Sequence, residues 1–414
     1  MPKKITRVSW SASGLPYGIS FDERTGTFSG WPEDKGEYYI PVKVKTNYGS
    51  DEKDVKIIVV GKSCPVYAIG HYAETWSERA SHDEDGFYPI NIPNAYKLSA
   101  RNNGFTAHVL GDGIYYCGVN AINTTAYEMA YQAFRAQNVP VHITAETASD
   151  ILCGIIQSAA TSTSGTTKST AYILRISRNG EVKFETSGAT IHKANTTTNT
   201  YINVSATRSN DISLSELGNA GFKLPEASYQ GSANLAQGIS WLSGDGSVLM
   251  TIKFSNSASS HTYSVSKQEL GFKAIKLFAP TNNTNLPFKY LSENKYLDNN
   301  PANFQIGVIK DAWVYGTTAY VQTENDNLYE YNSGSWNYQG YYDIEKLEIP
   351  ASGTVLMLTT DGQLYHKGSQ LTNITEAHDN FTPIFTNKKI RDMTLGISYQ
   401  NTSYQTLTVL IDNE

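Results

Sequence analysis

The segment His82-Asp83-Glu84-Asp85-Gly86 holds the densest group of potential metal ligands in the chain. Calcium prefers several oxygen ligands presented on a turn, and Asp-x-Asp-Gly forms part of such loops. The distal glutamate that completes a twelve-residue calcium loop is absent from the sequence that follows. We therefore predict a solvated acidic turn here and no metal site.

Other residues match parts of known catalytic motifs, but none of these motifs is complete. Glu324, Asp326 and Glu330 suggest the paired carboxyls of a glycoside hydrolase, but they surround a predicted hairpin turn, which indicates surface positions. The eight histidines show no HExxH-like spacing, and Gly334-Ser335-Trp336 does not extend to a Gly-x-Ser-x-Gly motif. Gly111-Asp112-Gly113 is typical of a turn and not of a phosphate loop. We predict no catalytic residue, no cofactor and no enzyme.

Aromatic residues crowd the stretch 313–342. Aromatic rings with polar neighbours stack on sugars or anchor interfaces, because they combine a large area with little rotamer entropy. A strand also turns alternate side chains inward, so we favour packing between sheets and contact between subunits, with an exposed recognition surface as the alternative. The candidate ligand-binding residues are Trp313, Tyr315, Trp336, Tyr338 and Tyr341.

The composition limits the class of protein. The chain of 414 residues is long enough for two or three domains. Its 28 Tyr against 5 Met favour β-structure. The net charge of −6 does not suggest the clustered basic face of a nucleic-acid-binding protein. No apolar run approaches the length of a membrane span, so we expect no membrane insertion.

The three cysteines, Cys64, Cys117 and Cys153, fit neither a disulfide framework nor a CxxC metal site. We predict buried thiols, which suit synthesis in a reducing compartment.

Near the N-terminus, residues 14–61 form a pattern of short strands and turns. Turn chemistry is present at Thr25-Gly26-Thr27 and at Asn47-Tyr48-Gly49-Ser50. Residues 38–45 and 54–60 alternate apolar and polar side chains, as half-buried strands do. The pattern predicts a small β-sandwich.

Two stretches of this segment, Gly14-Leu-Pro-Tyr-Gly-Ile-Ser-Phe-Asp22 and Thr25-Gly-Thr-Phe-Ser-Gly-Trp-Pro32, carry a resemblance. The segment resembles the Ig-like and cadherin-like modules that string together surface proteins of bacteria, archaea and phages. The resemblance implies a β-sandwich over residues 1–61 and no activity. Met1 directly precedes the module without the apolar region of a signal peptide, so we expect release by lysis rather than export.

Further along, from Lys62, β-hairpins with Asp-Gly or Asn/Asp turns recur. These residues reach positive φ cheaply and therefore suit tight hairpin turns. In the clearest copy, Asp361-Gly362 is followed by Tyr365 and then, three residues later, by Gly368. The predicted hairpins cover residues 355–368, 108–118, 171–184, 319–331 and 248–263. One amphipathic helix is expected over residues 127–136 and a low-complexity loop over 158–169.

The Asp-Gly-x-hydrophobic-Tyr-x-x-Gly element resembles the inner hairpin of the RCC1-like propeller repeat. The resemblance implies a β-propeller over residues 62–414, with six or seven blades at roughly 50 residues each. The copies lack the histidine and the Asn-x-x-Gly-Gln-Leu-Gly tail of that family, so exchange-factor activity is not implied. Residues 406–411 form a strand without a return strand, and residues 65–70 could pair with it, which would close the ring and remove open edges.

Together these features predict an all-β protein with an Ig-like β-sandwich and an RCC1-like propeller. The function we expect is that of a non-enzymatic phage virion protein that is assembled in the host cytoplasm and released by lysis. Its partners would be other virion proteins and a glycan or protein of the host surface, with a homo-oligomer as an open option. Two alternatives remain, a bacterial cell-surface glycan-binding adhesin and a propeller carbohydrate-active enzyme.

Overall fold

In the computed structural model, the regular secondary structure of the described residues is almost entirely β-strand. Among the described residues it contains one short helix, α1 (Ala73–Trp76), so the all-β prediction is confirmed. The chain divides into two compact units, Met1–Lys62 and Ser63–Glu414. No helix within the described residues has both the length and the hydropathy that a membrane crossing requires. The structure describes residues 8–30, 36–78, 80–101, 104–118, 137–144, 148–157, 169–177, 182–186, 192–194, 200–202, 209–213, 239–242, 246–256, 261–278, 286–301, 306–332, 334–351, 353–397 and 404–413.

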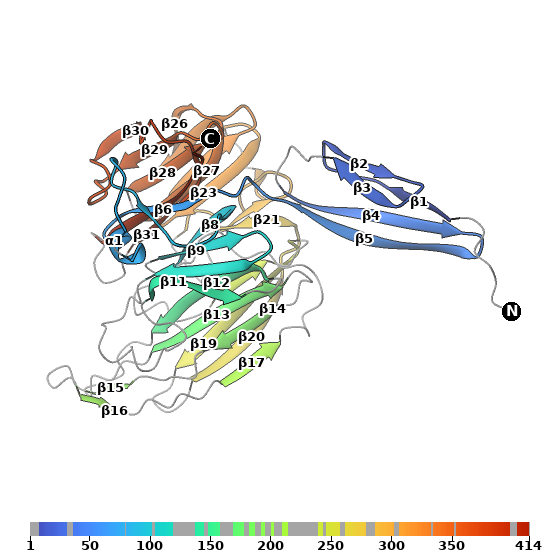
Figure 1. Ribbon diagram of the computed structural model, residues 1–414, viewed down its shortest axis with the longest axis horizontal. Helices are drawn as coiled ribbons and strands as arrows, with labels where there is room; N and C mark the ends of the chain where they lie inside the picture. The colour runs from blue at the N-terminus through green and yellow to red at the C-terminus, as the bar shows by residue number, and fades with distance from the viewer. Residues whose placement is uncertain are drawn as a thin grey trace. The chain divides into compact units, whose positions relative to one another are not determined.

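The first unit contains a three-stranded sheet and a separate hairpin (Figure 1). The sheet has the order β1 (Val8–Ala12), β4 (Gly36–Thr46) and β5 (Gly49–Val59), and the hairpin joins β2 (Ile19–Asp22) to β3 (Thr27–Gly30). Thr46 pairs with Gly49, so the hairpin turn predicted within residues 47–50 is confirmed and contains two residues between the paired positions. In the hairpin, the rings of Phe21 and Phe28 lie 4.8 Å apart.

The second unit is a series of antiparallel sheets (Figure 1). Among the described residues it has seven sheets and one small hairpin, formed by β15 (His192–Ala194) and β16 (Thr200–Ile202). The strands of the first four sheets are β8 (Lys97–Arg101), β9 (Gly104–Val109), β10 (Gly113–Gly118) and β11 (Gln137–Thr144); β12 (Ala148–Gln157), β13 (Ser169–Ser177), β14 (Val182–Thr186) and β17 (Ser209–Ser213); β18 (Ile239–Leu242), β19 (Val248–Asn256) and β20 (His261–Glu269); β21 (Ala274–Leu277) and β22 (Tyr290–Ser292). Those of the other three are β23 (Ile309–Tyr315), β24 (Thr318–Thr323), β25 (Asn327–Asn332) and β26 (Ser335–Tyr341); β27 (Ile344–Ala351), β28 (Thr354–Thr359), β29 (Leu364–Gly368) and β30 (His378–Ile384); β31 (Ile390–Ile397), β32 (Gln405–Ile411), β6 (Val66–Gly70) and β7 (Tyr88–Pro89).

Every hairpin predicted from the turn residues is confirmed. The pairs β9–β10, β13–β14, β19–β20, β24–β25 and β28–β29 are antiparallel neighbours in register. Local turn chemistry was sufficient to locate these pairs, since each turn joins strands that are adjacent in sequence.

The glycine of the Tyr-x-x-Gly element stands at a position where a side chain would clash with neighbouring backbone. Gly368 adopts φ 111°, and a Cβ there would collide with the carbonyl oxygen of Gly353, directly before the neighbouring strand β28. Gly70 adopts φ 113°, and a Cβ there would collide with the carbonyl oxygen of Gln405. Both glycines therefore end a strand where its partner's backbone approaches too closely for a side chain.

Sheets that follow one another pack face to face through buried apolar clusters. One cluster, with Leu358 and Leu407 among its members, joins the sheet β27–β30 to the sheet that contains β31 and β32. The next cluster includes Val66 and Phe105 and joins that sheet to the sheet β8–β11. In the sheet β31–β32–β6–β7, the last strand of the chain pairs with a strand from the start of the unit, with Val409 opposite Tyr67. Segments more than three hundred residues apart thus share one sheet.

The predicted buried thiols are confirmed for Cys64 and Cys117, which are free and buried. Burial raises the pKa of the Cys117 thiol well above its usual value. The side chain of Cys153, the predicted helix over residues 127–136 and residues 158–168 of the predicted loop lie outside what the structure describes.

Candidate functional site

The aromatic stretch forms most of the sheet β23–β26, whose two faces have different surroundings. One face packs into a cluster that includes Ala319, Val321 and Phe288. The opposite face packs into a second cluster that includes Tyr320 and Leu328. Because successive side chains of a strand point to opposite faces, the position of each aromatic residue decides which cluster it meets.

Strand β26 is the last strand of this sheet and carries an aromatic row. Trp336 pairs with Tyr331 and Tyr338 pairs with Tyr329, so all four rings lie on one face. Trp336 is half-buried and stacks on Phe288 with the ring centroids 6.0 Å apart. The row is therefore anchored at one end by the core.

A β-bulge brings a further tyrosine onto the same face. The register shifts between the Leu328–Gly340 and Tyr329–Tyr338 pairs, which leaves Gln339 as the extra residue of β26. Tyr338 and Tyr341 are three residues apart and would lie on opposite faces of a regular strand. The extra residue returns Tyr341 to the face of Tyr338, as bulges commonly redirect side chains.

These two tyrosines are uncovered. Tyr338 is 59% exposed and Tyr341 is 66% exposed, among the highest values for large apolar side chains in the described part of the second unit. The half-buried ring of Tyr329 meets Tyr338 edge-on at 5.5 Å. We call Tyr329, Tyr338 and Tyr341 the tyrosine platform.

A charged contact beneath the platform holds the bulge. Lys367 Nζ of β29 donates to Gln339 Oε1 at 2.6 Å and to Glu330 Oε2 at 2.8 Å. Lys367 and Glu330 are largely buried, and the ammonium lies 5.7 Å from the ring centroid of Tyr320. Burial raises the pKa of Tyr320, and the neighbouring Glu330 carboxylate raises it further. A lysine of the neighbouring sheet thus holds Gln339, the extra residue of β26, on the face opposite the platform.

The five predicted ligand-binding residues do not form one surface. Trp336, Tyr338 and Tyr341 share a face of the sheet, whereas Trp313 and Tyr315 lie on the opposite face. Trp313 is only 8% exposed and packs against the next sheet. Tyr315 is half-buried, and burial raises the pKa of its hydroxyl.

Tyr329, Gln339 and Lys367 belong to the platform and its support, but none of them was predicted from the sequence as a site residue. Tyr329 was part of the aromatic stretch but was not among the candidates. No sequence signal identified Gln339 as the bulge residue, because its partner Lys367 lies 28 residues away on another sheet.

Two of the three predicted carboxylate candidates are paired with lysine side chains. Asp326 Oδ1 accepts from Lys310 Nζ at 2.7 Å and from Gln322 Nε2 at 2.9 Å. Glu330 binds Lys367 as described, and Glu324 is exposed. Within the described residues, no group of three or more His, Cys, Asp or Glu is placed to hold a metal ion.

The acidic turn at residues 82–86 is held by a lysine. Lys388 Nζ lies 2.8 Å from Asp83 Oδ2 and 2.8 Å from Asp85 Oδ2. Asp83 Oδ1 also accepts from the backbone N–H of Phe87 at 2.9 Å. Burial opposes ionisation, but these bonds outweigh it and lower the pKa of Asp83. The ammonium of Lys388 occupies the place that a cation would take.

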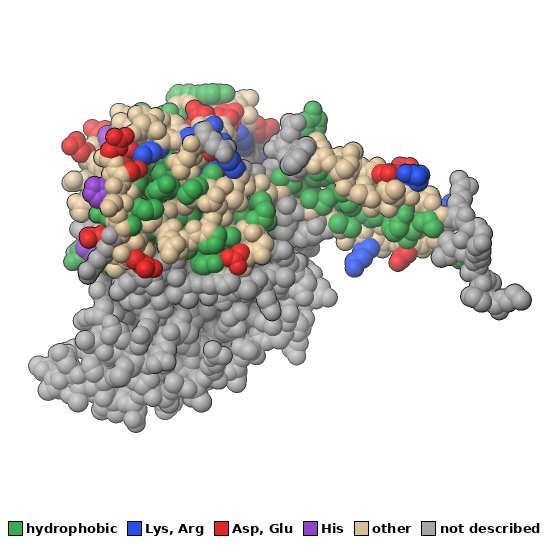
Figure 2. All heavy atoms as spheres, in the orientation of Figure 1, with side chains coloured by type: hydrophobic (Ala, Val, Ile, Leu, Met, Phe, Trp, Pro, Cys, Tyr) green, Lys and Arg blue, Asp and Glu red, His purple; other side chains and the backbone are tan. Residues whose placement is uncertain are grey.

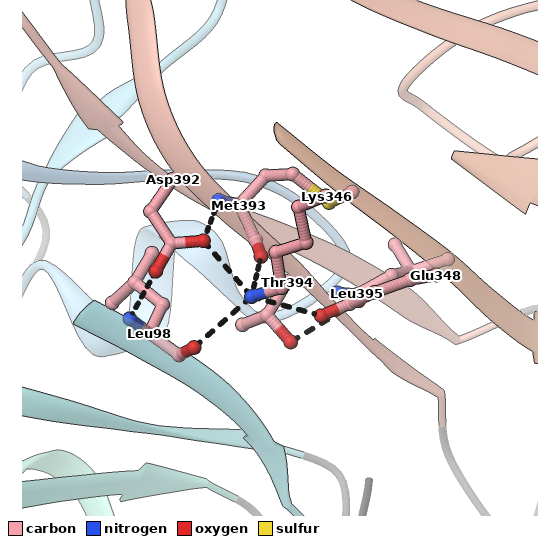
Figure 3. Close-up of polar contacts among 7 residues, drawn as sticks. All are labelled: Leu98, Lys346, Glu348, Asp392, Met393, Thr394 and Leu395. Atoms are coloured by element: carbon pink, nitrogen blue, oxygen red, sulfur yellow. Dashed lines mark hydrogen bonds and ion pairs between the residues drawn. The ribbon is translucent and has the colours of Figure 1, made fainter. Parts of the chain in front are cut away.

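A second polar cluster joins three sheets at their first strands (Figure 3). Lys346 Nζ of β27 lies 2.9 Å from Asp392 Oδ1 and 3.2 Å from Glu348 Oε1, and donates to the carbonyl of Leu98 at 3.1 Å. Asp392 Oδ2 accepts from the backbone N–H of Leu98 at 2.6 Å. The ammonium and both carboxylates are satisfied by one another and by nearby backbone groups, so we assign the cluster to packing between sheets and not to a ligand.

The charges of this cluster belong to a repeated pattern. Lys276 pairs with Asp311 at 3.1 Å, and each follows a register irregularity near the start of its strand, as Lys346 and Asp392 do. At the start of β8, Lys97 pairs with His108, and the preceding Tyr96 donates its backbone N–H to the carbonyl of His108. On β12, an irregularity precedes Asp150. Along β21, β23, β27, β31, β8 and β12 the residues are Lys276, Asp311, Lys346, Asp392, Lys97 and Asp150. Lysine and aspartate thus alternate from sheet to sheet.

In the view of Figure 2, acidic and basic side chains are interspersed over the described part of the second unit.

Comparison with known proteins identifies the first unit. Residues 2–60 match the family model described as "Putative Ig domain". The first unit is an Ig-like domain. No curated protein matches the chain.

Solved structures similar to the chain include human WBSCR16, with 11% identity over 84% of this chain and 100% of that chain, and a TM-score of 0.49. Yeast RCC1 (Prp20) bound to Kap60 has 10% identity over 86% of this chain and 90% of that chain, with a TM-score of 0.48. Prp20p from Saccharomyces cerevisiae has 10% identity over 84% of this chain and 92% of that chain, with a TM-score of 0.44. The chain therefore has RCC1-like structural neighbours. Because the TM-scores are below 0.5, we assign no activity of these neighbours to this chain.

Proposed function

We propose that this chain is a non-enzymatic recognition protein that binds its target through the tyrosine platform. The observation that carries the proposal is the exposure of Tyr338 and Tyr341 on one face of an outer strand. Exposed aromatic side chains that are held rigidly lose little entropy on binding, and such residues dominate recognition surfaces. Trp336 on Phe288 and Gln339 on Lys367 supply that rigidity.

The setting we propose is a phage particle. In this proposal, the Ig-like domain docks to other virion proteins and the second unit faces the host surface. The support is the resemblance of residues 1–61 to modules of surface proteins, together with the match of residues 2–60 to the Ig-domain family model. Mass spectrometry of particles purified from a lysate that contains the protein tests this setting. Its presence in the lysate and its absence from the particles would contradict the setting.

For the second unit we propose a closed seven-bladed RCC1-like propeller. The support is the series of seven sheets, the pairing of β32 with β6, and the contacts of β23 with β27, β27 with β31, and β31 with β8. In a ring of seven sheets, strict alternation of lysine and aspartate would place two like charges on neighbouring sheets, unless the first strand of one sheet is uncharged. The first strand β18, with the sequence Ile239-Ser-Trp-Leu242, has no charged residue. A density map with seven sheets around one axis is expected. An open arc between the sheets of β12 and β18 would contradict closure.

The recognition proposal is tested by binding of the labelled full chain to cells of candidate hosts. We expect the double variant Tyr338→Ala/Tyr341→Ala to lose cell binding, because both exposed rings are removed. Tyr17→Ala is the matched control, since Tyr17 is 70% exposed but belongs to the first unit. Unchanged cell binding by the double variant would overturn the platform as the recognition site.

A further inference from the structure

The chemistry around the tyrosine platform defines the class of its ligand. Asn327 pairs with Tyr341 on the platform face, and its amide provides a donor and an acceptor beside the exposed ring. The phenol rings of Tyr338 and Tyr341 offer apolar faces with hydroxyl edges. A ligand that matches this surface has apolar ring faces and many hydroxyl groups.

Two acidic residues close to the platform in sequence, Glu330 within β25 and Asp326 directly before it, are each paired with a lysine. Glu330 forms an ion pair with Lys367 on the opposite face of the sheet, and Asp326 forms an ion pair with Lys310. Lys310 also lies 3.7 Å from Asp343. Because these charges already have partners, a charged ligand would gain little binding free energy from them. A neutral ligand would not have to displace a charged partner.

The spacing of the platform favours an extended ligand. Tyr338 and Tyr341 pair with Tyr329 and Asn327, which are two residues apart on β25. Two residues of a strand span about 7 Å, so the two rings lie at successive positions along the strand edge. A single sugar ring covers one tyrosine, whereas a linear chain of sugar rings spans both.

We propose that the tyrosine platform binds a neutral, linear polysaccharide chain by stacking sugar rings on Tyr338 and Tyr341. This inference rests on the proposed recognition function and names its ligand class. Gln339 and Lys367 act as positioning residues, because the bulge that they hold places both tyrosines on one face.

The test is calorimetric titration of the full chain with cellohexaose, maltohexaose and mannohexaose, and with hexagalacturonate as the charged counterpart. We expect one of the neutral hexamers to bind with an affinity that is independent of salt, since screening acts only on charges. Hexagalacturonate is expected not to bind more tightly. Tyr338→Ala and Tyr341→Ala should each lower the affinity by about tenfold, the effect of removing an anchoring aromatic residue.

Conservative variants separate stacking from folding. Tyr338→Phe and Tyr341→Phe keep the ring and should bind within about threefold of the original chain, since most of the stacking area is retained. Gln339→Ala should weaken binding while thermal unfolding of the chain changes little, because Gln339 is partly exposed and its loss frees only the bulge. Tyr17→Ala should bind like the original chain.

The outcomes distinguish the two proposals. If none of the neutral hexamers binds while Tyr338→Ala/Tyr341→Ala still abolishes cell binding, the polysaccharide assignment is overturned and the recognition site stands, with a protein as its target. If hexagalacturonate binds best and salt weakens it, the neutral class is wrong. If the alanine variants bind a hexamer as tightly as the original chain, the platform is not the sugar site.

Discussion

Lys346 Nζ lies 2.9 Å from Asp392 Oδ1, and the two residues belong to neighbouring sheets of the second unit (Figure 3). The same ammonium donates to the carbonyl of Met393 at 2.7 Å. With Glu348 and the backbone of Leu98, this lysine connects the first strands of three sheets. The contact links sheets that come from distant parts of the chain.

Lys346→Met should therefore destabilise the second unit strongly. The substitution leaves the largely buried carboxylates of Asp392 and Glu348 without their counterion, and loss of one partner of a buried pair costs about 3 kcal/mol. Urea unfolding monitored by tryptophan fluorescence measures the change. The control is Lys273→Met, whose pair with Glu293 is exposed and 3.9 Å long, and it should change stability by less than about 1 kcal/mol. Equal effects of the two variants would contradict the assigned role of Lys346.

The buried histidine His366 should make the second unit sensitive to acid. Burial, and to a smaller extent the charge of His378, lower the pKa of His366 to about 4. The Nδ1 atoms of the two rings lie 2.9 Å apart. Among the described residues, Nε2 of His366 has no hydrogen-bond partner. A group whose pKa is depressed on folding contributes stability above its unfolded pKa of about 6.5 and loses it as the pH falls through the folded value. The free energy of unfolding should fall by up to about 3 kcal/mol between pH 6.5 and pH 4 from this residue.

Urea midpoints measured at several pH values test this dependence. His366→Gln removes the titration, so its stability should depend less on pH in this range than that of the original chain. His82→Gln is the control, because His82 lies on an exposed turn. A parallel pH dependence of the original chain and His366→Gln would refute the role of His366.

Gly368→Ala should cost more stability than Gly353→Ala. Both glycines have positive φ, 111° and 76°, so each alanine bears backbone strain of about 1 kcal/mol. Only the Cβ at position 368 collides with backbone, whereas at position 353 the nearest contact is Ser369 Oγ at 3.8 Å. Thermal unfolding of the two variants measures the difference. Similar melting temperatures would show that the strand end can shift to accept a side chain.

Calcium should leave the stability of the second unit unchanged. Hydrogen bonds from Lys388 to Asp83 and Asp85 raise the pKa of the lysine, which remains a cation in the place of a metal ion. Melting temperatures with calcium and with a chelator should agree. In Lys388→Met, the acidic turn loses its counterion and should become more susceptible to proteolysis. A rise in melting temperature of the original chain with calcium would contradict this account.

Much of the local structure could be predicted from the sequence. Asp361-Gly362 and similar turns located the hairpins, because a two-strand unit joined by a tight turn depends on residues that adjoin one another. The alternation of Lys276, Asp311, Lys346 and Asp392 could also have been noticed, since three of these residues stand two positions after an isoleucine. The pattern has no meaning, however, until the strands that carry it are known to be neighbours.

The candidate site shows where the sequence was insufficient. The residue types alone suggested packing between sheets or an aromatic recognition surface. They could not separate Trp313 from Tyr338, because a strand pattern does not say which face is covered by another sheet. Tertiary structure decided this. Phe288 covers Trp336, the next sheet covers Trp313, and Lys367 holds the bulge that places Tyr338 and Tyr341 on one exposed face. Turns depend on neighbours in sequence, whereas burial and bulges depend on partners that only folding brings together.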